Sequence, residues 1–308
     1  MIKYYQRTIK DQKLKKLEHF LIGSLVHVID PQEEEIKSLA KQFSLDVDIL
    51  KDALDPYEAP RMEIKKDIAY IFARVPRHDE EMNNISTFPV MFAIGKNFFI
   101  IASQENTDFL LSAISRRKKY YTTQRTKLFI KMFSEIEDKY NYLLNNISRR
   151  INYFGLNSAN IKDEDIIGFV KLEVILNEFI SALLPVRHVL SSVISGKALG
   201  LYQDDRDLIE DLQLNNDQLI ERSKSYLTNI VNIRQAQEVI STNRLNRVMK
   251  VLTASTVILA LPTMITSLYG MNVDLPFVSG SGSFWGILTV ITALTGTLLV
   301  ILKKSKII

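Results

Sequence analysis

The residues best placed to handle a dissolved ion lie in an uncharged stretch near the C-terminal end of the chain and in the turns just before it. Six positions there recur at spacings of three and four residues, so they share one face of a helix. They are Asn246, Met249, Leu252, Thr256, Ala260 and Thr263. Several are small or polar, as the wall of an ion pathway requires. Plain helix–helix packing through small residues would give a similar pattern and is the alternative.

Other kinds of chemistry have little support in the sequence. Its 308 residues include no cysteine and four widely separated histidines, which excludes thiolate sites and gives no histidine spacing for a metal. The HExxH, GxSxG and Walker lysine motifs are absent. The net charge of +4 is no argument for nucleic acid. We therefore predict a protein that is not an enzyme, has no cofactor and binds no nucleic acid.

Four residues of this face belong to the first of two uncharged segments, Val251–Tyr269 and Phe284–Leu302, and the other two precede it. As a helix each would span about 28 Å, close to the roughly 30 Å hydrocarbon core of a bilayer. Phe284 and Trp285 suit the aromatic belt at a membrane interface. We predict two C-terminal transmembrane helices; two buried helices of a soluble domain are the alternative.

Positive charge predicts how these segments are oriented. Basic residues precede the first segment and follow the second: Arg244, Arg247, Lys250, Lys303, Lys304 and Lys306. The loop 270–283 carries only Asp274, and the polar, basic Met1–Lys16 has no apolar core typical of a signal peptide. By the positive-inside rule both termini are cytoplasmic and the loop lies outside the plasma membrane.

The first hundred residues show strand and helix signals in alternation. Apolar runs predict strands, and charged periodic runs after Asp30 and Asp46 predict helices that begin at those caps, with Pro31 in the first turn of the first helix. The predicted strands are 20–29, 61–64, 68–75, 88–94 and 98–102, and the predicted helices are 30–42 and 46–54. Residues 1–104 are therefore predicted to form an α/β domain.

Helical periodicity replaces strand signals after Ser103. Helices are predicted at 106–118, 122–153 and 163–194, with Lys131, Glu135 and Asp138 among the residues on solvated faces. From Asp205 no proline or glycine occurs before Pro262, so one helix of roughly 100 Å is expected to need partners, a membrane, or both. The fold class is thus an α+β membrane protein. Its predicted parts are a cytoplasmic α/β domain (1–104), a cytoplasmic helical region (105–204), a stalk helix (205–250), a pore-lining span (251–269), an outside loop (270–283), a second span (284–302) and a basic tail (303–308).

The end of the first span carries a short motif that resembles a known family. Tyr269-Gly270-Met271-Asn272 matches the Gly-Met-Asn signature of the CorA-type magnesium transporters, at the outer end of the penultimate span. Segments 49–61, 94–102, 182–194 and 243–253 resemble parts of the same family in the same order. The similarity therefore covers nearly the whole chain.

This resemblance implies a homopentamer in the bilayer that moves Mg²⁺ inward through an axial pore lined by the first span. It makes Gly270, Met271 and Asn272 the ion entrance, where oxygens of Gly270 and Asn272 would contact the hydrated ion while Met271 packs. Thr263 would add a hydroxyl ring. Met249 and Leu252 would form apolar constrictions, and Asn246 would lie near the cytoplasmic mouth; these complete the face described above.

The resemblance also implies closure by cytoplasmic Mg²⁺ bound between subunits. Asp211 and Asp52 match the positions concerned, although Lys51 stands where an acidic residue is often found. Asp274 is expected to attract cations outside, or to be only a solvated loop residue. The same fold could instead carry Zn²⁺, Co²⁺ or Ni²⁺. An alternative of another class is a membrane-anchored coiled-coil scaffold or sensor.

Overall fold

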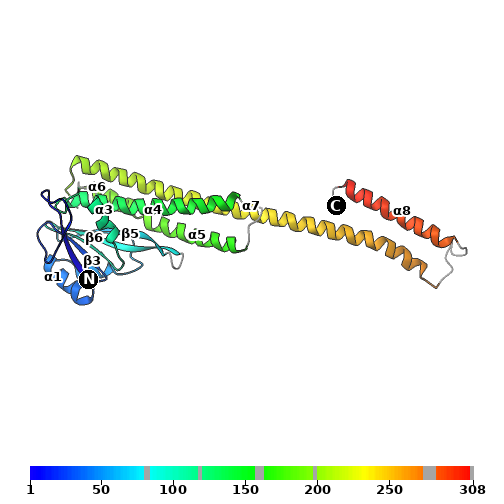
Figure 1. The fold of residues 1–308 in the computed structure, drawn as a ribbon, viewed down its shortest axis with the longest axis horizontal. Coiled ribbons are helices and arrows are strands. Elements are labelled where there is room, and N and C mark those ends of the chain that lie inside the picture. The colour runs from blue at the N-terminus through cyan, green and yellow to red at the C-terminus, as the bar shows by residue number, and fades with distance from the viewer. Residues whose placement is uncertain (80–83, 117–119, 157–162, 197–199, 273–281, 306–308) are drawn as a thin grey trace. The chain divides into compact units, whose positions relative to one another are not determined.

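The structure is a computed structural model that describes residues 1–79, 84–116, 120–156, 163–196, 200–272 and 282–305 (Figure 1). It divides into two compact units, Met1–Ile233 and Arg234–Ile308. The first contains a sheet covered by helices, and the second contains two apolar helical segments.

The first unit is built on a seven-stranded sheet with strand order β2-β1-β3-β7-β6-β5-β4. Only β3 and β7 pair in parallel, and the other neighbours are antiparallel. The central strands are apolar on both faces, as is usual for strands covered on both sides. The strands are β1 (Ile2–Gln6), β2 (Lys15–Leu17), β3 (Leu25–Ile29), β4 (Met62–Lys65), β5 (Ile68–Asp79), β6 (Asn84–Ile94) and β7 (Phe99–Ser103).

Helices cover both faces of this sheet, and alternate residues of each strand enter different cores. Tyr70 and Phe72 face the core formed with α1 (Glu33–Phe43) and α2 (Val47–Asp52). Ile71 and Ala73 face the larger core on the other side. That side carries α3 (Asp108–Arg116), α4 (Arg125–Leu156), α5 (Asp163–Leu183), α6 (Val186–Ile194) and the beginning of α7 (Gln203–Tyr269), as Figure 1 shows for the labelled helices. Residues 1–104 and the helices that follow therefore pack as one unit.

Some local predictions were wrong, each for a physical reason. Asp30 does not cap the first helix as predicted, because it adopts a left-handed φ of 42°. The N-cap of α1 is Gln32, and its backbone N–H donates to the Glu35 side chain. The predicted helix 163–194 is two helices, since Pro185 lacks the N–H that would continue the ladder. Strands β1 and β2 were not predicted at all.

Lys131 was placed on a solvated face of its helix, but its side chain is only 7% exposed. The methylene stem of this residue lies in the helical layer, and its ammonium group donates to Glu135 one turn along α4. The prediction was therefore wrong for Lys131, whereas Asp138 on the same helix is exposed as predicted.

The second unit contains the C-terminal part of α7 and helix α8 (Ser283–Lys304). α7 is a single helix of 67 residues, and Pro262 does not end it. Both helices contain windows long and apolar enough to cross a membrane, and those windows are 6% and 0% buried. So large an exposed apolar surface is expected when lipid or other copies of the chain cover it.

Candidate ion pathway and metal-binding residues

The six residues of the predicted pore face are all exposed on α7 in the single chain. The opposite side of the helix is less exposed: Ala254 is 3% exposed, and Ile258 and Ile265 are partly buried. Ala254 lines a cavity together with Leu302 of α8, so this is the side on which α8 lies. Asn246 and Met249 of the predicted pore face also line this cavity, whereas Leu252, Thr256, Ala260 and Thr263 do not. Within this unit, α8 therefore lies away from the last four residues of the face.

The threonines of this face direct their hydroxyl protons into their own helix. Thr256 Oγ1 donates to the Leu252 carbonyl at 2.9 Å, and Thr263 Oγ1 donates to the Leu259 carbonyl at 2.8 Å. A hydroxyl oxygen has two lone pairs besides its proton. These side chains consequently face outward as hydrogen-bond acceptors, which can accept hydrogen bonds from the water around a cation.

The Gly-Met-Asn motif follows the last turn of α7, and its three residues are exposed. The Gly270 N–H donates to the carbonyls of Thr266 and Ser267 at 3.1 and 3.2 Å. Its φ is not in the left-handed region, and an added Cβ would meet those carbonyls only at ordinary distances of 3.5–3.6 Å. The single chain therefore shows no steric need for glycine here. Asp274 lies outside the described residues.

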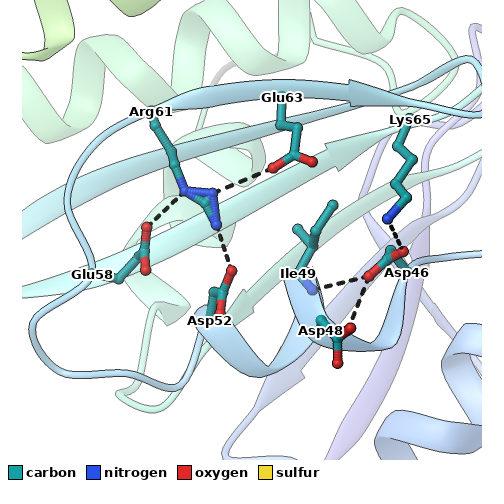
Figure 2. Close-up of polar contacts among 8 residues, drawn as sticks. All are labelled: Asp46, Asp48, Ile49, Asp52, Glu58, Arg61, Glu63 and Lys65. Atoms are coloured by element: carbon teal, nitrogen blue, oxygen red, sulfur yellow. Dashed lines mark hydrogen bonds and ion pairs between the residues drawn. The ribbon is translucent and has the colours of Figure 1, made fainter.

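Asp52 lies at the end of α2 beside Arg61, an ion pair that sequence reasoning did not predict (Figure 2). The Arg61 Nη2 to Asp52 Oδ2 distance is 2.5 Å, and Arg61 Nε donates to Glu58 at 2.9 Å. Glu63 lies 3.5 Å from the same guanidinium. A metal ion bound by Asp52 would thus compete with Arg61, whose own group is a strong bidentate partner for carboxylates.

The N-cap residue of α2, Asp46, forms a second ion pair, which is also drawn in Figure 2. Asp46 accepts from the backbone N–H groups of Asp48 and Ile49 and pairs with Lys65 at 2.5 Å. The bond from Lys65, followed by those from the backbone, lowers the pKa of Asp46. This carboxylate is therefore used to begin α2 and to hold the edge strand β4 against it.

Asp211 is exposed on α7, on the other side of the sheet from Asp52. Its neighbours Ile209 and Leu212 belong to the larger core, whereas Ile49 of α2 belongs to the smaller one. One chain accordingly does not bring Asp52 and Asp211 together. Among the described residues, no group of three or more histidine, cysteine or acidic side chains is placed to hold a metal.

A buried carboxyl group, Glu137 of α4, was not predicted as a residue of interest. It is 5% exposed, and neither oxygen has a hydrogen-bond partner of normal geometry. Burial raises its pKa from 4.5 to about 9; the Asn215 side chain opposes the shift, and the charge of Asp138 adds to it. Glu137 is therefore protonated and neutral at physiological pH.

Comparisons with known proteins agree along the whole chain. The model of the family described as "CorA-like Mg2+ transporter protein" matches residues 24–304. The cobalt/magnesium transport protein CorA of Methanocaldococcus jannaschii is 27% identical over 298 residues, 90% of this chain and 88% of that protein. The same protein from Thermotoga maritima is 22% identical and covers 88% of this chain and 79% of its own length.

Solved structures show the same fold. The complete CorA magnesium transporter from Methanocaldococcus jannaschii aligns with a TM-score of 0.89 at 24% identity, covering 100% of this chain and 99% of that one. The cytoplasmic domain of ZntB from Vibrio parahaemolyticus aligns with a TM-score of 0.62 at 12% identity, over 79% of this chain and 97% of that domain.

Proposed function

Because the chain belongs to the family of CorA-like Mg²⁺ transporter proteins, we propose that it carries Mg²⁺ into the cell through a pore lined by several copies of α7. Membership makes it a membrane transporter of divalent cations, in which α7 and α8 supply the transmembrane helices. The fold supports this arrangement, since both helices are apolar, exposed and long enough to span the bilayer.

The observation that carries the proposal is the acceptor face of α7. Mg²⁺ gives up its water reluctantly, so a wall that accepts hydrogen bonds from bound water suits the hydrated ion. Thr256 and Thr263 present such oxygens on the side of α7 away from α8. Asn272 follows at the end of the helix and would add a neutral carbonyl at the mouth. Hydrated Mg²⁺ would then pass without meeting a carboxylate.

The number of copies and the orientation are part of the proposal. A closed ring of five chains, the arrangement implied by the family resemblance, would surround one pathway with five acceptor faces. The basic residues beside both helix ends favour cytoplasmic termini and a plasma-membrane location. Asp52 and Asp211 would bind regulatory Mg²⁺ only between neighbouring chains, because one chain holds them on opposite sides of its sheet.

Co²⁺ is the second ion to test, since the relative from Methanocaldococcus jannaschii is named a cobalt/magnesium transport protein. The predicted pore face has no cysteine or histidine, the soft or borderline ligands that favour Co²⁺, Ni²⁺ or Zn²⁺. We therefore expect Mg²⁺ to be the preferred ion.

The proposal can be tested in liposomes that contain a Mg²⁺-sensitive dye and carry an inside-negative potential. Influx is expected for the native protein and is expected to be lost in Asn272→Ala. Asn229→Ala, which removes an exposed asparagine of α7 far from the motif, is the matched control and should transport normally.

Size-exclusion chromatography of each variant would establish that folding and assembly are intact. Absence of influx of Mg²⁺, Co²⁺, Ni²⁺ and Zn²⁺ from well-folded, correctly inserted native protein would refute transport and favour an anchored scaffold. Equal influx in native protein and Asn272→Ala would remove Asn272 from the entrance.

A further inference from the structure

A cavity of about 1050 Å³ lies within the second unit, beside the start of the apolar part of α7 and the end of α8. Three of its lining residues are basic: Arg247, Lys250 and Lys303. Its remaining lining residues are amides, small polar groups and apolar side chains: Asn243, Asn246, Met249, Val251, Thr253, Ala254, Val257 and Leu302. The cavity thus combines cationic side chains with an apolar wall.

The three cations lack a charged partner in the part of the chain that the structure describes. None of them forms an ion pair among the described residues. The sequence also contains no acidic residue between Glu238 and Asp274, and none after Asp274. Because no described acidic side chain pairs with these three cations, an anion from outside the chain is suited to neutralise them.

We propose that this cavity binds the phosphate headgroup of an anionic phospholipid, with one acyl chain along its apolar wall. Basic pockets between transmembrane helices near the cytoplasmic surface are suited to such headgroups. Arg247 and Lys303 would contact the phosphate from two different helices, and Val251 and Val257 would contact the hydrocarbon. The proposal goes beyond ion transport and needs only that these helices lie in a membrane.

A second copy of the chain is a poorer occupant of the cavity. In a symmetric ring, a neighbouring α7 presents the same residue numbers at the same height along the axis. Those residues are basic or neutral, so a neighbour would bring like charge to Arg247 and Lys250. Like charges in a confined space repel each other. A lipid phosphate supplies the charge that the protein lacks.

The test measures binding of a fluorescent short-chain phosphatidylglycerol to the full-length protein in neutral detergent. Arg247→Gln/Lys303→Gln removes one pocket cation from each helix. Its matched control, Arg244→Gln/Lys304→Gln, removes one exposed cation from each of the same helices at nearly the same level, but neither residue lines the cavity. Both variants therefore lower the net charge equally.

The pocket variant is expected to bind phosphatidylglycerol about thirty-fold more weakly, because each basic residue near an anionic surface contributes about a factor of five. The control variant should bind within about two-fold of the native protein. Equal loss in both variants would refute a built site and indicate general surface charge. The charge-keeping variant Arg247→Lys/Lys303→Arg should retain most of the binding, and its failure to do so in folded protein would also refute the proposal.

Two further arms separate the possible sources of the phosphate. Phosphatidylcholine is expected to compete weakly, because its headgroup has no net charge. Inorganic phosphate at millimolar concentration should not displace the fluorescent lipid, because it cannot use the apolar wall. Displacement by inorganic phosphate as effective as by phosphatidylglycerol would assign the cavity to a soluble anion and overturn the lipid proposal. Equal competition by phosphatidylcholine would overturn it as well.

Discussion

Replacing Glu137 with glutamine is expected to raise the thermal midpoint of the folded protein at pH 8 and to leave it nearly unchanged at pH 4.5. The carboxyl group is 5% exposed, and burial raises its pKa from 4.5 to about 9. Between these two values the folded state holds a proton that the unfolded state has released. Stability therefore falls by about 1.4 kcal/mol for each pH unit above 4.5.

At pH 8 the free energy of unfolding is therefore lower by an amount on the order of 3–5 kcal/mol than it would be with a neutral side chain. A glutamine of the same shape is neutral and would restore this stability. For a unit of this size, each kcal/mol corresponds to about 2–4 °C, so the midpoint should rise by about 10 °C at pH 8. Any pH-independent cost of burying the amide is present at both pH values. The difference between the two pH values therefore isolates the carboxyl group.

The assay is intrinsic-fluorescence melting of the full-length protein in detergent from pH 4.5 to 8. The matched control is Asp138→Asn, because Asp138 is the adjacent residue but is exposed to solvent. The control should keep almost the whole pH slope of the native protein. If Glu137→Gln melted at the native temperature at pH 8, or lost stability equally at every pH, Glu137 would be ionised in the fold and the reasoning from its burial would fail.

Three other perturbations follow from contacts described above. Thr263→Val keeps the side-chain shape but removes the outward acceptor, so Mg²⁺ influx should fall at least about ten-fold. The control Thr289→Val loses an equivalent 2.8 Å bond to the backbone of α8 and should transport normally. An equal loss of influx in both variants would show that Thr263 does not line the pore. Arg61→Ala releases the Asp52 carboxylate, so half-inhibition by internal Mg²⁺ should occur at a lower concentration; an unchanged value would argue against gating at Asp52. His27→Gln should flatten the loss of stability from pH 6.5 to 4, because burial lowers the pKa of His27 to about 4 and the unfolded chain takes up the proton first; a melting profile identical to the native one would refute this.

The fold was predictable from sequence where the pattern depends on burial alone. The apolar runs of β5, β6 and β7 and the long periodic stretch of α7 confirm this. Strand β1 was not predicted, because its sequence shows no regular alternation of apolar and polar residues. This agrees with its burial, since all five of its residues are partly buried. The three residues of β2 are too short a run to give a signal. Pro185 lay within an otherwise helical period, and its lost backbone bond decided the break.

The candidate site was predictable to a different degree in its two parts. The pore face follows from spacing, since helical geometry places residues three and four apart on one side. All six residues are exposed, and the four from Leu252 to Thr263 lie away from α8, whereas the role of the face in transport stays a prediction. The partner of Asp52 depends on the pairing of β4 with β5, which brings Arg61 to the end of α2. No local pattern contains that information, and the same holds for the burial of Glu137.

The internal bonds of Thr256 and Thr263 have a consequence for anions. Their hydroxyl groups already donate hydrogen bonds to the carbonyls of Leu252 and Leu259. Chloride needs donors to replace the water around it, and these side chains have none left to offer. A ring of such threonines would therefore discriminate by the sign of the charge although it carries no charge itself. In that case, a wall that is electrically neutral would reject anions through the direction of its hydrogen bonds.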